Sequence, residues 1–126
     1  MAVAATLAGC LGADEEPRPA TGAPRDIAAV VERFERATAE RDFATVCDDL
    51  FTAAARERAG AEDCERLTRS AAAGVARPRI ETKAIEVEGD RARVEVTTHA
   101  TGQARVPEVL ELRREGGAWR VEALAD

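Results

Sequence analysis

The sequence predicts an α+β fold, with helices first and a four-stranded antiparallel meander after them. Apolar residues recur at helical spacings of three and four from about residue 24 to residue 73. After Pro78 the period changes to two, which is typical of strands with one buried face. The length of 126 residues corresponds to one domain with a modest core.

The first helix is expected to begin at Pro24 and to end near Arg41. Proline suits the first helical turn, where the carboxylate of Asp26 also interacts favourably with the helix dipole. The apolar stripe has i, i+3, i+4, i+7 spacing and contains Ile27, Val30, Val31, Phe34, Ala37 and Thr38. We expect Arg41 and Asp42 to break this helix.

Three shorter helical segments are expected next. The first carries a second apolar stripe, formed by Phe43, Val46, Cys47, Leu50 and Phe51. Thr52 can cap the following helix, residues 53–59, and Gly60 can end it. The last of these helices is expected at about residues 61–73.

The first two strands, residues 79–87 and 91–100, are expected to form a hairpin around a Gly89-Asp90 turn. This turn sets three cross-strand pairs: Val87 with Ala92 and Ile85 with Val94 on the inner face, and Glu86 with Arg93 on the outer face. Continuing the inner face backwards reaches Lys83, which does not suit a core. We therefore expect a β-bulge near Lys83 and Ala84.

The last two strands, residues 104–114 and 118–124, are expected to join at a glycine turn, residues 116–117. Their register gives three neighbouring pairs: Leu112 with Val121, Leu110 with Ala123, and Arg114 with Trp119.

The composition excludes nucleic acid as a partner. The formal net charge is −6 at pH 7, whereas a nucleic-acid-binding protein needs a basic face that neutralises phosphates. The chain contains three phenylalanines, one tryptophan and no tyrosine, so its small core would benefit from a covalent staple. No stretch is long enough to span a bilayer as a mature helix.

Residues 1–10 resemble the end of a bacterial lipoprotein signal peptide. The motif Leu7-Ala8-Gly9-Cys10 is similar to the lipobox, in which signal peptidase II cleaves before a cysteine that receives lipid. A start codon upstream would explain why no basic residue precedes Cys10. The alternative is an alanine-rich N-terminus with an incidental cysteine. Lipidation of Cys10 would anchor the protein to the outer, extracytoplasmic face of the cell membrane.

Residues 11–24 have the composition of a disordered tether. Proline, glycine and acidic residues are frequent there, and apolar periodicity is absent. The folded domain is then expected to cover residues 25–126.

The order of the elements over residues 25–126 resembles the nuclear transport factor 2-like fold. The local features that carry the resemblance are the stretch Val30-Val31-Glu32-Arg33-Phe34, the break Arg41-Asp42-Phe43 and the strand Gly117-Ala118-Trp119-Arg120-Val121. The resemblance implies that the N-terminal helices pack in the concave face of a bent four-stranded antiparallel sheet. It also implies a cone lined by Phe34, Phe43, Leu112 and Trp119.

Cys47 and Cys64 lie on neighbouring predicted helices. In an exported chain they would face an oxidising space as an even pair, and exported domains of similar fold carry cysteine pairs in these helices. We therefore expect a disulfide. The alternatives are two buried thiols, or a catalytic or metal site. A metal would need four ligands, or three and a water, and His99 is the only histidine.

The sequence identifies no catalytic residue and no cofactor site. Enzymes of the ketosteroid-isomerase-like type, which share the fold that this chain resembles, place a carboxylate base and hydrogen-bond donors, often tyrosine, inside the cone. This chain has no tyrosine, and its candidate bases are expected in turns or on exposed faces: Asp42, Asp48, Asp49, Asp90 and His99.

We therefore expect a non-catalytic, membrane-anchored lipoprotein domain that binds a small apolar ligand or an envelope protein. A homodimer through the sheet is a further expectation. The alternative function is a ketosteroid-isomerase-like enzyme that acts on a small apolar substrate in the cone, because the fold hosts many unrelated activities.

Overall fold

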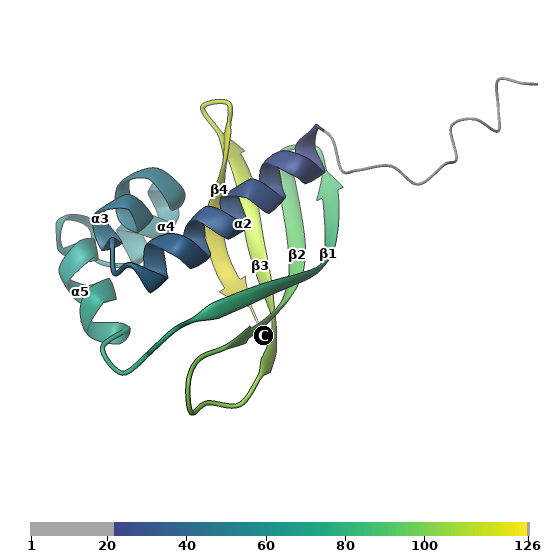
Figure 1. Ribbon diagram of the computed structural model, residues 1–126. Helices are drawn as coiled ribbons and strands as arrows, with labels where there is room; N and C mark the ends of the chain where they lie inside the picture. Colours follow the sequence, from purple (N-terminus) through teal and green to yellow (C-terminus); the bar gives the residue numbers. More distant parts are fainter. Residues whose placement is uncertain (1–21, 126) are drawn as a thin grey trace, which may run out of the picture.

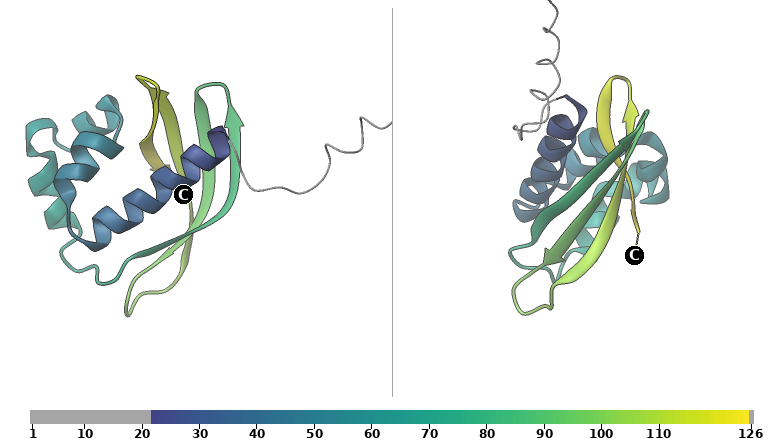
Figure 2. Two further views of the ribbon diagram at one scale, coloured as in Figure 1. Left: turned by 45° about the horizontal axis from the view of Figure 1, so that its top comes forward. Right: turned by 90° about the vertical axis from the view of Figure 1, so that its right-hand side faces the viewer.

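The computed structural model describes residues 22–125. A long helix is followed by a group of short helices and then by an antiparallel sheet with the strand order β1-β2-β3-β4. The sheet bends around the long helix, and the short helices lie beside β4 (Figure 1 and Figure 2). The predicted α+β class, with helices packed against the concave face of the sheet, is confirmed.

The long helix α2 spans Ala23–Ala39, and its apolar stripe packs against the sheet. It ends two residues before the predicted position because the backbone N–H of Asp42 donates to the carbonyl of Ala37 at 2.8 Å. Arg41 has a φ of 60°, the left-handed conformation that commonly follows a helix end. The predicted break at Arg41 and Asp42 is confirmed.

Five short helical segments follow: α3 at Phe43–Thr45, η2 at Val46–Leu50, α4 at Ala53–Arg58, η3 at Ala61–Asp63 and α5 at Cys64–Ala71. The Thr52 hydroxyl accepts a hydrogen bond from the N–H of Ala55 at 3.0 Å, so the predicted cap is confirmed. The segment η2 is a π-helix rather than the ordinary helix expected there. Its wide turn closes where the N–H of Phe51 donates to the carbonyl of Val46 at 2.9 Å.

A disulfide joins Cys47 of η2 to Cys64 at the start of α5, as predicted. The two Cα atoms are 6.1 Å apart, and both side chains are buried. Because the sulfurs are bonded to each other, neither is a free thiol or a metal ligand. The disulfide connects α5, in which only Cys64 is buried, to η2, in which three of the five residues are buried.

The strands β1, Arg79–Glu88, and β2, Arg91–His99, form the predicted hairpin. All three predicted pairs are present: Val87 with Ala92, Ile85 with Val94, and Glu86 with Arg93. The predicted bulge is also present, since the register shifts between Thr82 and Ala84 and leaves Lys83 without a paired residue. On the far side of this bulge, Ile80 packs against the core.

The strands β3, Val106–Glu115, and β4, Ala118–Ala125, contain one difference from the prediction. Leu112 pairs with Val121 and Arg114 pairs with Trp119, as expected. The predicted pairing of Leu110 with Ala123 is wrong, because Leu110 pairs with Leu124. A β-bulge at Glu122 inserts one extra residue into β4, and this residue contacts Thr52 of the helical part.

The buried apolar residues form two clusters. The main cluster joins Ile27 and Val31 of α2 to the inner face of β2, β3 and β4. The second cluster contains Ala37, Phe43, Val46 and Leu50. Phe34 and Phe51 pack against both clusters and are only partly buried, so they mark the position where the two clusters meet.

Two sequence predictions lie outside the described residues: the signal segment with Cys10, residues 1–10, and residues 11–21 of the tether. None of the helices in residues 22–125 is long and apolar enough to cross a membrane.

Candidate functional site

An apolar hollow of about 450 Å³ lies where α2, α4 and the strands β3 and β4 come together. The apolar side chains that line it are Phe34, Phe51, Ala55, Ala59, Leu110, Val121, Ala123 and Leu124. A volume of this size falls in the range of small-molecule sites, which are about 300–1,000 Å³. We call this feature the apolar hollow.

Two aromatic rings form part of the wall of the apolar hollow. The ring centroids of Phe34 and Phe51 are 6.3 Å apart, and the rings are tilted by 44°. They pack against both core clusters and line the hollow together with residues at the end of β4. At that end Leu124 is 56% exposed, which is high for a large apolar side chain. The hollow therefore offers apolar surface from both layers of the fold.

The rim of the apolar hollow carries one polar cluster, formed by Thr52, Arg58 and Glu122. The bulge in β4 directs Glu122 towards the helices, where its Oε1 accepts a hydrogen bond from the buried Thr52 hydroxyl at 2.7 Å. Its Oε2 lies 3.5 Å from Nη2 of Arg58, and the same nitrogen donates to the backbone carbonyl of Glu122. The cluster ties α4 to β4 and places a guanidinium at the edge of an apolar surface.

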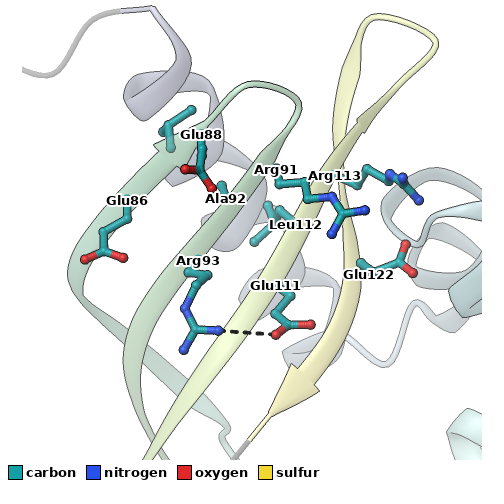
Figure 3. Close-up of a pocket in the computed structure, with 10 residues that line it drawn as sticks. Glu86, Glu88, Arg91, Ala92, Arg93, Glu111, Leu112, Arg113 and Glu122 are labelled. Carbon is teal, nitrogen blue, oxygen red and sulfur yellow. Dashed lines mark hydrogen bonds and ion pairs between the residues drawn. The ribbon is translucent and has the colours of Figure 1, made fainter.

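A second hollow, of about 590 Å³, lies on the outer face of the sheet (Figure 3). Its lining is mostly charged and includes Glu86, Glu88, Arg91, Arg93, Glu111 and Arg113. Arg93 pairs with Glu111 at 3.4 Å across β2 and β3. Interleaved charges of this kind are typical of a solvated sheet face.

The four residues predicted to line a cone occupy three different environments. Phe34 lines the apolar hollow. Leu112 and Trp119 are buried in the main core cluster, and Leu112 also borders the outer hollow. Phe43 is buried in the second cluster. Of the predicted set, only Phe34 therefore reaches the apolar hollow.

The predicted candidate bases have different partners and come from different segments, except for the consecutive residues Asp48 and Asp49 of η2. Three of them have separate partners: Asp42 with Thr45 (2.7 Å), Asp48 with Arg56 (3.4 Å) and Asp90 with Arg114 (3.3 Å). Hydrogen bonds from the hydroxyl and the N–H of Thr45 hold the pKa of Asp42 below its ordinary value. His99 is the last residue of β2. Within residues 22–125, no three histidine, cysteine or acidic side chains gather as a metal site would require.

No protein-family model and no curated protein matches the chain. Solved structures do match it. A protein of unknown function from Silicibacter pomeroyi, named as NTF-2-like, is 19% identical and has a TM-score of 0.61. The match covers 80% of this chain and 91% of that one.

Two further structures show the same likeness. A protein from Campylobacter jejuni, named as a candidate NTF2-like transpeptidase, is 16% identical over 81% of this chain and 99% of its own, with a TM-score of 0.53. A de novo designed NTF2 fold protein is 18% identical over 82% and 87%, with a TM-score of 0.56. The order of elements, the bent sheet and these structural matches agree: the chain has the nuclear transport factor 2-like fold.

Proposed function

We propose that the protein is a non-catalytic, lipid-anchored domain on the outer face of the cell membrane, and that it binds a small apolar ligand. The observation that carries the proposal is the apolar hollow, whose walls come from Phe34, Phe51, Leu110 and Leu124. Ligand sites are mostly apolar, with a few polar groups that orient the ligand, and the Arg58–Glu122 pair supplies such groups at the rim.

The contacts of Glu122 favour a structural role for this carboxylate. A carboxylate that acts as a general base must face the substrate with an oxygen available for the proton. Glu122 is the acidic residue at the apolar hollow, and its two oxygens contact Thr52 and Arg58. This arrangement uses the carboxylate to hold α4 against β4.

The disulfide supports the proposed location. Stable disulfides form in oxidising compartments outside the cytoplasm, and the Cys47–Cys64 bond fits such a compartment. The lipobox-like motif at Cys10 supplies the proposed anchor, and two or more acyl chains give stable membrane attachment where one does not. An envelope-protein partner and a homodimer through the sheet remain predictions.

Titration with 1-decanol, followed by amide NMR shifts, tests the binding proposal on the folded domain. We expect saturable shifts at residues that line the apolar hollow, and roughly fivefold weaker binding by Leu124→Ser, since part of an apolar side chain contributes about 1 kcal/mol. Val106→Ser is the matched control, because Val106 is 45% exposed and does not line the hollow. Unsaturable shifts, or equal weakening by both variants, would contradict the proposal.

A further inference from the structure

We infer that the apolar hollow selects ligands that have an anionic head group, and that Arg58 recognises this group. The ligand class is then an alkyl carboxylate, with its chain against Phe34, Phe51 and Leu124 and its head at the rim. The inference rests on the proposed ligand-binding function and adds a charge preference to it.

The hydrogen-bonding capacity of Arg58 is only partly used. A guanidinium has five N–H donors, and the contacts of Arg58 within residues 22–125 all involve Nη2. Its Nε and Nη1 have no partner in that part of the chain, and the side chain is 57% exposed. Arg58 also lines the apolar hollow, so a ligand that lies there can approach its exposed side chain.

The carboxylate at the rim is less accessible to a ligand than the guanidinium. Oε1 of Glu122 accepts from the Thr52 hydroxyl at 2.7 Å, and Oε2 faces Arg58 at 3.5 Å. The Glu122 side chain is only 24% exposed. An ammonium head group would therefore compete with the existing partners of Glu122, whereas a carboxylate can pair with Arg58 donors that have no partner within residues 22–125. Two oxygens on one carbon also match the fork of a guanidinium.

The overall negative charge of the protein would by itself favour a cationic ligand over an anionic one. A net charge of −6 favours the approach of cations over anions at long range. Selection of a carboxylate over an amine must therefore come from a local group. Arg56 lies on the same helix but pairs with Asp48 and does not line the hollow, so it provides a matched control.

The test compares decanoate, 1-decanol and decylamine, below their aggregation limits, by amide NMR titration of the folded domain. We expect decanoate to bind about two- to fivefold more tightly than 1-decanol, the range that one exposed ion pair gives, and decylamine to bind no better than 1-decanol. Arg58→Ala should remove the preference for decanoate, Arg58→Lys should retain part of it, and Arg56→Ala should leave it unchanged.

Two results would overturn the inference: equal affinity for decanoate and 1-decanol, or an unchanged preference in Arg58→Ala. Saturable binding of 1-decanol in either case would leave the proposed ligand-binding function standing. Failure of every probe to saturate would remove both. Circular dichroism checks that Arg58→Ala folds. If it does not fold, the head-group comparison on the unsubstituted protein decides the question.

Discussion

The disulfide between Cys47 and Cys64 should contribute a large share of the stability of the domain. The two residues are separated by 17 positions in the sequence. In the chain-entropy model, a bond that closes a loop of this length stabilises a protein by about 3 kcal/mol. Small domains have total stabilities of about 5–15 kcal/mol, so removal of the bond should be obvious in any unfolding experiment.

Thermal unfolding of Cys47→Ala/Cys64→Ala, followed by circular dichroism, measures this contribution. For a domain of this size, 1 kcal/mol corresponds to about 4 °C, so we expect a Tm lower by roughly 12 °C. Alanine is the cleaner replacement because both positions are buried, and a serine hydroxyl there would lose its water partners. Cys47→Ser should also lower the Tm.

Reductant separates loss of the bond from loss of packing. It should lower the Tm of the unsubstituted protein towards that of the alanine variant and should leave the variant itself unchanged. Two results would refute the reasoning: Tm values within about 2 °C for the two proteins, or an equal effect of reductant on both.

Three further predictions concern side chains that hold the helical part against the sheet. Arg120→Ala should lower the free energy of unfolding in urea by about 1–2 kcal/mol, because Nη1 of Arg120 donates to backbone carbonyls at the end of η2 at 2.9–3.5 Å. Arg113 is the cross-strand neighbour of Arg120, and Arg113→Ala should have little effect in the same experiment. Thr52→Val should lower the free energy of unfolding by about 2 kcal/mol in the same assay, because it removes a helix cap and a buried hydroxyl donor. Thr52→Ser keeps the hydroxyl and should lower it less. Asp42→Ala should lower the Tm at pH 7. Hydrogen bonds from Thr45 lower the pKa of Asp42 in the folded protein, so this stabilisation is present above the unfolded pKa, near 3.8, and is lost as the pH falls through the folded value. The gap in Tm should therefore shrink below about pH 3.8, and a gap that stays constant with pH would contradict this account.

Most of the sheet could be predicted from local sequence. The Gly89-Asp90 turn and the alternation around it define one register, because a slip of one residue would expose the apolar face. The bulge at Lys83 was predictable for the same reason, since a lysine interrupts an otherwise consistent inner face. In both cases neighbours along one hairpin determine the outcome.

The bulge at Glu122 and the π-helix could not be predicted in this way. In β4 the residues Val121, Glu122 and Ala123 fit plain alternation, and the extra residue is accommodated by contacts with Thr52 and Arg58, which lie far away in the sequence. These tertiary contacts also create the polar rim of the apolar hollow. The sequence pattern therefore identified Phe34 as facing inward and gave no signal for Arg58 or Glu122.

The apolar hollow likewise depends on how two separate core clusters meet. Periodicity shows which face of an element is buried, but it does not show whether the faces of different elements fill the space between them. The hollow is lined by residues next to two irregular positions, the end of η2 and the bulge of β4. These lining residues are Phe51, Leu110 and Leu124.

The intact mass of the native protein, extracted from membranes with detergent and measured with and without reductant, tests the proposed location most directly. We predict a chain that begins at Cys10, carries a diacylglyceryl-sized addition and gains two hydrogens on reduction of the Cys47–Cys64 bond. A chain without lipid that retains the residues before Cys10 and shows no change on reduction would contradict both the anchor and the oxidising compartment.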